Sequence, residues 1–310
     1  MTAVLTALGT MTLIALAGWL LASTRVLGPE APKVLARVVF TLSTPSLLIT
    51  TIGSANLQLL LTPAALSTWV STLIVAAIAV VIFALLLRAD RSITTIGALS
   101  ASYLNAGNLG IPVAVYVLGD ALAVVPTMLL QLLVLAPVAF AVGDARPGRR
   151  RRDAVLRALR SPLTIAALLG LALALVPWQL PTVLEQPLRA LAATAAPLAL
   201  LTLGMSMVRS APPPGAPKPA LDRRHWAGVL VATGMRTLVH PALTYLVADL
   251  VGVPDEARFA VVLMAALPTA QNVLVYAMQF DAGQRLARDA QVITTSASLP
   301  LMVAVVALLH

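Results

Sequence analysis

The sequence predicts an all-α integral membrane protein whose ten transmembrane helices form two inverted five-helix repeats. The first observation behind this is composition: 59% of the residues are hydrophobic and only 11% are charged, with a mean hydropathy of +0.94. The second is a series of continuous apolar segments of about 20 residues, the length that spans a bilayer. The third is a pattern shared by the two halves of the chain. Because a soluble domain needs roughly 25% charged residues to cover its surface, a soluble enzyme is excluded.

The absence of cysteine and the low number of histidines exclude or disfavour several kinds of functional site. The chain has no cysteine, which excludes a disulfide scaffold, an iron–sulfur cluster and thiol chemistry. Its three histidines, His225, His240 and His310, argue against a multi-histidine metal site. We therefore expect no metal and no cofactor, and leave proton or sodium coupling open.

Ten apolar segments define the expected transmembrane helices. They lie at 4–22, 34–54, 63–87, 93–117, 122–142, 162–177, 184–208, 226–250, 257–280 and 290–309. The sixth is the shortest. The first resembles a signal peptide at Ala15-Leu16-Ala17, but no basic residue precedes it, as a signal peptide would require. We therefore expect a retained helix.

The distribution of basic residues predicts the orientation of these helices. The connections that follow odd-numbered segments contain 18 of the 21 lysine and arginine residues. Cytoplasmic loops are enriched in these residues. An even number of spans then places both termini on the extracytoplasmic side. The exceptions are Arg189, Arg236 and Arg258.

A long basic loop separates the predicted repeats. Residues 1–142 form the first five-helix repeat, 143–161 the basic cytoplasmic loop, and 162–310 the second repeat. The run of arginines at 149–152 has no interleaved aromatic residues, so we interpret it as a topology anchor that touches anionic lipid head groups, and expect no nucleic-acid partner. The proline-rich stretch 209–225 is predicted to be a flexible cytoplasmic linker.

Two pairs of similar stretches relate the halves to each other. Residues 113–121 of segment 4 match 273–282 of segment 9 with one insertion, and both contain Val-Xaa-Val-Tyr. Residues 45–53 of segment 2, from Pro45 to a glycine, match 197–204 of segment 7, which begins at Pro197. An odd number of spans per half inverts the second copy, and inverted repeats are typical of secondary transporters. We expect both prolines to break their helices.

Segments 4 and 9 contain the strongest helix-breaking signals. The stretch 105–112 reads Asn-Ala-Gly-Asn-Leu-Gly-Ile-Pro, and 267–272 reads Leu-Pro-Thr-Ala-Gln-Asn. Proline removes a backbone donor, so Pro112 and Pro268 deprive the carbonyl groups of Asn108 and Met264 of their helical partners. Symmetric breaks of this kind indicate a substrate site near the bilayer midplane. The alternative is a pair of packing kinks whose amides bind neighbouring helices.

A carboxylate suits such a site. Half-helix N-termini offer unpaired N–H groups and partial positive charge, and uncharged amides can donate to carboxylate oxygens. The predicted substrate-binding residues are Asn105, Asn108, Gly110, Pro112, Pro268, Gln271, Asn272 and Arg236.

These motifs resemble the auxin efflux carrier family over essentially all ten segments. The resemblance rests on Asn-Xaa₄-Gly-Ile-Pro from Asn105, on the Ala-Ala-Leu-Pro that ends at Pro268, and on the closing segment with Thr294-Thr295-Ser296 and Leu299-Pro300. It implies two inverted five-helix repeats in which segments 4 and 9 cross at their breaks, and it implies that Asn105 contacts the substrate carboxylate. Gln271-Asn272 departs from the plant pattern.

The resemblance also implies a substrate class and a location. Plant members export auxin, and bacterial members are associated with malate, malonate and similar acids. Without the long central loop of many plant exporters, the chain resembles a compact bacterial member of the inner membrane. A homodimer is left open.

Arg236 is predicted to lie about 15 Å inside segment 8, counting roughly 1.5 Å per residue. A buried arginine needs a partner or a cavity, and no acidic residue lies at that depth, since Asp249 is near the outer surface. Arg236 therefore either binds carbonyl groups freed at the breaks or raises the potential of an anion cavity. His240, four residues on and on the same face, is a candidate proton-coupling residue or a structural one.

The leading functional hypothesis is a secondary transporter for small organic anions that works by elevator-like alternating access around the crossed helices. A sodium-coupled carrier like the bile acid symporters is the alternative within this class, although their Pro-Gly-Gly and Ser-Asn pattern is missing. A channel or a non-transporting sensor is also retained. Rhomboid, metalloprotease and aspartyl protease motifs are missing, which argues against an intramembrane enzyme.

Overall fold

The computed structural model describes residues 2–55, 62–143, 151–176, 180–208 and 222–309. Throughout these residues the secondary structure is helical, with no strand beyond one isolated antiparallel bridge. Five helical stretches of the described chain are long and apolar enough to cross a membrane: Ala31–Gly53, Pro63–Leu86, Ala121–Gly143, Thr182–Ser206 and Gln284–Leu309. Shorter apolar helices occupy Gly9–Ser23, Ala106–Val117 and Pro162–Leu175. The chain is therefore a multi-pass membrane protein.

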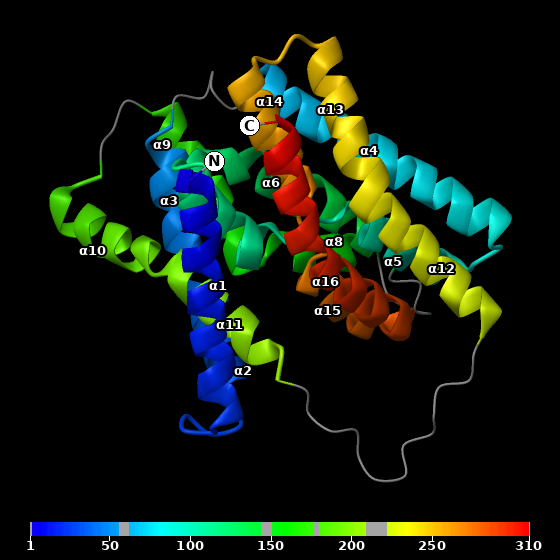
Figure 1. Ribbon diagram of the computed structural model, residues 1–310, viewed down its shortest axis with the longest axis horizontal. Helices are drawn as coiled ribbons and strands as arrows, with labels where there is room; N and C mark the ends of the chain where they lie inside the picture. The colour runs from blue at the N-terminus through cyan, green and yellow to red at the C-terminus, as the bar shows by residue number, and fades with distance from the viewer. Residues whose placement is uncertain (1, 56–61, 144–150, 177–179, 209–221, 310) are drawn as a thin grey trace.

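One group of helices, here called the flanking layer, combines the start of each half of the chain. Its elements are α1 (Thr2–Ser23), α2 (Ala31–Val38), η1 (Val39–Ser43), α3 (Thr44–Gly53), α9 (Pro162–Leu175), α10 (Thr182–Ala193) and α11 (Ala195–Ser206). Figure 1 shows these helices together on its left side. Helix α1 packs on α11 and α3 packs on α9, so each contact joins one half of the chain to the other.

The remaining membrane helices form a second group, here called the crossing bundle. From the first half come α4 (Pro63–Val81), η3 (Ile82–Leu86), α5 (Arg91–Ser102), η4 (Ala106–Gly110), η5 (Val113–Val117), η6 (Ala121–Val124), α6 (Val125–Leu130), η7 (Gln131–Leu135) and α7 (Ala136–Gly143). From the second half come α12 (Arg223–Gly234), η8 (Met235–Val239), α13 (His240–Leu250), α14 (Asp255–Ala265), α15 (Gln271–Phe280) and α16 (Gln284–Leu309).

Polar residues start several helices where the apolar segments begin. Thr62 accepts a hydrogen bond from the N–H of Ala65 (3.2 Å) at the start of α4, and Asp90 accepts one from Ile93 (2.8 Å) at α5. Ser161 and Asp222 cap α9 and α12 in the same way. Such caps satisfy backbone donors that have no partner within the helix.

Close packing in the flanking layer depends on glycine. A Cβ atom on Gly18 would overlap the backbone of Leu201, and one on Gly204 would overlap the carbonyl group of Ala15. The backbones of α1 and α11 therefore cross without side chains between them. At the other crossing, a Cβ on Gly170 of α9 would lie 3.0 Å from the carbonyl oxygen of Leu48 in α3.

The prolines predicted to break segments 2 and 7 produce milder distortions. Pro45 follows the π-helical turn η1, and the helical stretch Ala31–Gly53 continues through it. Pro197 lies in the first turn of α11, after a turn at Thr194. The hydroxyl groups of Ser43 and Thr194 lie 2.8 Å apart, so the two distortions adjoin each other.

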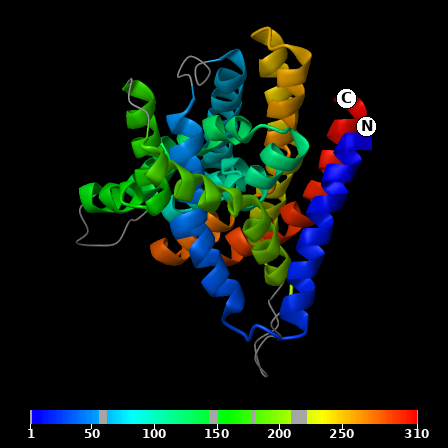
Figure 2. The same ribbon diagram turned by 90° about the vertical axis from the view of Figure 1, so that its left-hand side faces the viewer.

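Two predicted loops lie partly outside the described residues. Arg149 and Arg150 of the basic run lie outside them, whereas residues from Arg151 begin the helix α8 (Arg151–Leu159), which packs on α7. Of the predicted linker 209–225, residues 209–221 lie outside the described chain, and α12 begins at Arg223. The start of α1 and the end of α16 lie close together in both views (Figures 1 and 2).

Candidate functional site

Segments 4 and 9 are both interrupted, and their interruptions cross. Helix α5 ends at Ser102 and α14 at Ala265. The backbone then pairs in an isolated antiparallel bridge between Leu104 and Thr269. Its hydrogen bonds run from the N–H of Asn105 to the carbonyl of Pro268 (2.9 Å) and from the N–H of Ala270 to the carbonyl of Tyr103 (3.0 Å). Four helix ends therefore meet inside the crossing bundle.

Side chains from the last segment of each half satisfy the remaining backbone groups at the bridge. The amide of Gln131 donates to the carbonyl of Leu104 (3.0 Å). The hydroxyl of Thr294 accepts from the N–H of Thr269 (3.1 Å), and the hydroxyl of Thr269 donates to the carbonyl of Ser100 (2.6 Å). Non-helical backbone at membrane depth is tolerated only where protein or water satisfies it. These contacts hold the open segments in place.

The half-helices that leave the crossing begin with amides. The side-chain oxygen of Asn105 accepts from the N–H of Asn108 (3.4 Å) and so caps η4, while no described residue accepts from its Nδ2 group. Nδ2 of Asn108 donates to the side-chain oxygen of Gln271 (3.3 Å), the first residue of α15. The starts of both half-helices are thus joined through two amides. Helix N-termini carry partial positive charge, so this pair favours an anion.

The other predicted site residues surround these amides. A Cβ on Gly110 would lie 3.1–3.2 Å from side chains of Leu267, Val124 and Met264, so this glycine allows the two interrupted segments to pack closely. Asn272 is half-buried and interacts with the hydroxyl of Tyr103. Pro268 lies at the bridge itself.

The break in segment 4 lies before the predicted position. The backbone is non-helical at 103–105, and Pro112 lies between the π-helical turns η4 and η5 of the following half-helix. In segment 9, Pro268 removes the helical partner of the Met264 carbonyl as predicted, but that oxygen accepts from the N–H of Leu267 (3.2 Å).

Arg236 lies at the C-terminal ends of the two helices that enter the crossing, α5 and α14. Its guanidinium donates to the carbonyl of Ser102 (3.4 Å) and to that of Ala265, the last residues of α5 and α14. The side chain is 0% exposed and Nε has no partner. Helix C-termini carry partial negative charge, which a cation neutralises. Of the two predicted roles, these contacts favour the one in which Arg236 binds carbonyls at the breaks.

His240 extends the same buried network. Its Nδ1 lies 2.7 Å from a guanidinium nitrogen of Arg236, and its Nε2 lies 3.1 Å from the hydroxyl of Thr72 in α4. Both ring nitrogens therefore have partners within the crossing bundle. Its role in coupling stays a prediction.

Two cavities adjoin the segment that follows the first break. One, of about 390 Å³, includes Leu109 and lies against α1, α11 and α16. The second, of about 260 Å³, includes Ile111 and lies against α3, α10 and α11. Both lie between the flanking layer and the crossing bundle.

Several residues at the crossing were not predicted from the sequence. Gln131, Thr269 and Tyr103 are buried there, and Tyr103 lies with its hydroxyl 3.4 Å from that of Tyr276. A lone glutamine in an apolar segment is a signal that could have identified Gln131. Within the described chain, no group of three or more His, Asp or Glu side chains could hold a metal ion.

Comparison with known proteins adds two similarities. The profile of the family described as "Membrane transport protein" matches residues 3–147 and 149–306. A protein of Rhizobium meliloti (strain 1021), named "Putative malonate transporter", is 30% identical over 215 residues. That alignment covers 66% of this chain and 64% of the relative, so the chain matches slightly less than two thirds of the relative's length.

Proposed function

Because this chain belongs to the membrane transport protein family, of the auxin efflux carrier type, we propose that it is a secondary transporter for small carboxylates. The relative named for malonate makes a three-carbon dicarboxylate the first candidate substrate. The substrate binds at the crossing of the two interrupted helices, where Asn105, Asn108 and Gln271 gather.

This proposal rests on a difference in charge between the groups that contact the four helix ends at the crossing. The negative ends, at Ser102 and Ala265, are occupied by Arg236. The positive ends, at η4 and α15, have only neutral amides beside them. The local field at the N-terminal ends therefore stays positive, which favours a carboxylate over a cation or a neutral solute.

The proposed architecture is ten helices in two inverted repeats, 1–142 and 162–310. Corresponding contacts in the two halves support it. Leu104 pairs with Thr269, and each is held by the last segment of its own half, through Gln131 and Thr294. Transport then proceeds by movement of the crossing bundle against the flanking layer, since the two cavities lie along that interface.

The proposed location is a bacterial inner membrane with both termini on the extracytoplasmic side. The proximity of the start of α1 to the end of α16 supports placing them on one side (Figure 2), and the basic connections support the orientation.

Counterflow of labelled malonate in proteoliposomes tests the proposal. A carrier exchanges labelled for unlabelled malonate without net flux, whereas a sensor does not move it and a channel shows no counterflow. Repeating the assay with and without sodium separates the proposed carrier from a sodium-coupled symporter. If malonate produced no counterflow and no shift in melting temperature, the proposal would be contradicted for this substrate.

A further inference from the structure

We propose that the 260 Å³ cavity between α3, α10 and η5 is a second carboxylate subsite, in which Arg189 receives the substrate before it reaches the helix crossing. This inference rests on the proposed function and adds a residue and a location that the crossing does not contain.

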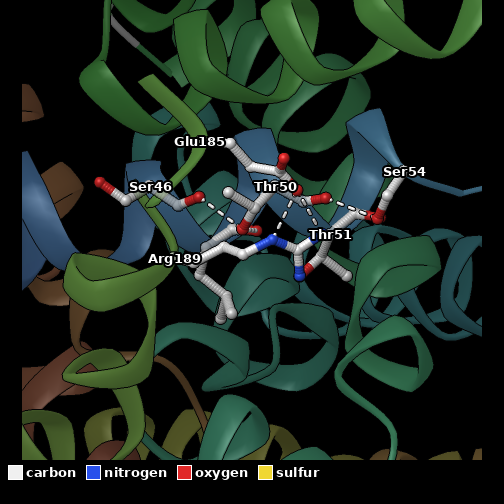
Figure 3. A network of polar contacts seen from close by, with 7 residues as sticks. Ser46, Thr50, Thr51, Ser54, Glu185 and Arg189 are labelled. Atoms are coloured by element: carbon white, nitrogen blue, oxygen red, sulfur yellow. Dashed lines mark hydrogen bonds and ion pairs between the residues drawn. The ribbon is translucent and has the colours of Figure 1, made fainter. Parts of the chain in front are cut away.

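The cavity has a largely apolar lining that includes two threonines and one arginine. Thr50 and Thr51 come from α3, Arg189 comes from α10, and Tyr116 of η5 lies on the side of the crossing bundle. Figure 3 shows the guanidinium of Arg189 directed from α10 toward Thr50 and Thr51. The hydroxyl of Thr50 donates to the carbonyl of Ser46 (2.9 Å), so the guanidinium of Arg189 is the main donor that the cavity offers to a carboxylate.

Arg189 keeps most of its donors for a ligand. Its Nε donates to one oxygen of Glu185 (2.7 Å), and Nη2 lies 2.7 Å from the same oxygen. Of the five N–H groups of an arginine, these contacts use two, and no other described residue binds the guanidinium. The side chain is 60% exposed, so the ion pair with Glu185 is weak. An incoming carboxylate can share the guanidinium with Glu185 or displace it.

Arg258 provides a contrast on the same predicted face of the membrane. Its guanidinium is 2.9 Å from Asp249 and 3.1 Å from Asp255, donates to the carbonyl of Val253 (3.2 Å), and lies 5.6 Å from the centre of the Tyr245 ring. Two carboxylates balance its charge, and it lines neither cavity. Both arginines are exceptions to the cytoplasmic distribution of basic residues. The contacts of Arg258 indicate a structural role, whereas Arg189 keeps donors with which it can bind a ligand.

The position of the cavity connects it to the crossing. Ile111, in its wall, follows Asn108 by three residues, which is about one helical turn. The cavity also lies between the flanking layer and the crossing bundle, on the C-terminal half of α3. In the proposed orientation this is the extracytoplasmic side. A carboxylate held by Arg189 is therefore close to the half-helix that carries Asn105 and Asn108. Substrate can enter the cavity from only this side of the membrane.

Sided uptake of labelled malonate tests the subsite. In right-side-out and inverted membrane vesicles, Arg189→Gln should raise the half-saturation concentration for malonate about two- to fivefold at the face where the cavity opens, the range of a solvent-exposed ion pair. The value at the other face should stay unchanged. Glu185→Gln should lower the half-saturation concentration at the first face, since it frees the guanidinium, and Arg189→Lys should restore part of the loss.

Two further variants separate this inference from the proposed function. Arg258→Gln removes a charge on the same predicted face outside the cavity and should leave malonate uptake unchanged. Asn105→Asp should weaken uptake from both faces. The subsite alone would be overturned if Arg189→Gln still transported malonate and its half-saturation concentration were unchanged, or changed equally at both faces. Failure of the unaltered protein to bind or transport malonate would overturn the proposed function and the subsite with it.

Discussion

Arg236 shows how a single buried charge can set the polarity of the proposed binding site. It has the largest fully buried side chain of the described residues, and its partners are carbonyl groups at two helix ends and the ring of His240. By neutralising the negative ends of α5 and α14, it leaves the positive ends of η4 and α15 to dominate the crossing.

Substitution of Arg236 should therefore reduce stability first. In Arg236→Lys and Arg236→Gln, carbonyls of Ser102 and Ala265 lose partners, at about 1–3 kcal/mol for each buried group left unsatisfied. Lysine does not replace arginine here, because it lacks the planar fork that reaches two carbonyls. We expect a lower melting temperature for both variants in detergent.

The affinities of the same preparations for malonate and for acetate test whether Arg236 also sets the electrostatic potential of the cavity. If Arg236 sets the cavity potential, loss of its charge should weaken dianion binding about twice as much in free energy as monoanion binding, because Coulomb energy scales with the product of charges. Equal losses would assign it to local structure. Unchanged melting and unchanged affinity would contradict both roles.

Asn105 has one observed role, as a helix cap, and one proposed role, in substrate binding, and its substitutions can separate them. Its oxygen caps η4, and no described residue accepts a hydrogen bond from its Nδ2 group, which is the group proposed to bind the substrate. Asn105→Asp keeps a capping oxygen but replaces the donor with an acceptor, so it should fold normally and lose malonate affinity about tenfold or more, since a hydrogen bond to a charged group contributes roughly 1.5–3 kcal/mol.

Asn105→Ala removes both the cap and the donor, so it should lose affinity and some stability together. Isothermal titration with malonate and thermal unfolding measure the two effects. Retention of full affinity by a folded Asn105→Asp protein would remove Asn105 from the site.

The sequence predicted these residues because asparagine, glycine and proline stand out in apolar segments. Asn105, Asn108 and Pro268 were identified in this way, and all three lie at the crossing. Gln131 and Thr294 were not assigned a role at the site. A single polar residue in an apolar helix resembles an ordinary packing residue until its partner, here the backbone of Leu104 or Thr269, is known from the fold.

At the scale of elements, glycines determine how closely α1 and α11 approach. Gly18 and Gly204 each face the backbone of the opposite helix, whereas Gly9, also in α1, has open space around its Cβ position. Small residues at helix crossings are typical of membrane proteins, because tight packing drives association where the hydrophobic effect does not.

Gly18→Ala and Gly9→Ala form a matched pair in one helix. Gly18→Ala forces the backbones apart and should destabilise the protein by about 1–3 kcal/mol, the range for overpacking. Gly9→Ala should be neutral or stabilise by up to about 1 kcal/mol, since alanine favours a helix. Thermal unfolding of both variants measures the difference, and equal melting temperatures would show that the α1–α11 contact adds no stability.

The π-helical turns mark the limit of prediction at this scale. The sequence predicts apolar segments and their proline signals, but the chain places η1 before Pro45 and η4 before Pro112 rather than opening the helix at either proline. A π turn accommodates one extra residue within a helix, and whether a chain widens or breaks depends on neighbours that only the folded structure supplies. For segment 4 the open backbone lies at 103–105, where the bridge to Thr269 satisfies it.

At the scale of the whole molecule, the two helix groups meet along a boundary that contains both cavities. Helices far apart in sequence form each group: α1 packs on α11 and α3 on α9 in the flanking layer, and α4 packs on α13 and α5 on α12 in the crossing bundle. Composition and segment length predicted a multi-pass membrane protein correctly. The division into flanking layer and crossing bundle could not be predicted from them, since it depends on which apolar faces contact each other and apolar faces differ little in composition.

A cross-link between the groups should stop transport, and the cysteine-free sequence makes the experiment direct. Leu203 of α11 and Leu299 of α16 line the same 390 Å³ cavity from opposite groups, whereas Leu16 of α1 and Leu203 line it from one group. After reaction of cysteine pairs at these positions with a bifunctional thiol reagent, the 203–299 pair should lose malonate counterflow, because alternating access requires one group to move against the other. The 16–203 pair should keep it. Malonate binding should survive in both, since neither pair touches Asn105 or Gln271. Continued counterflow by fully cross-linked 203–299 protein would show that the substrate crosses without relative movement of the two groups, as in a channel.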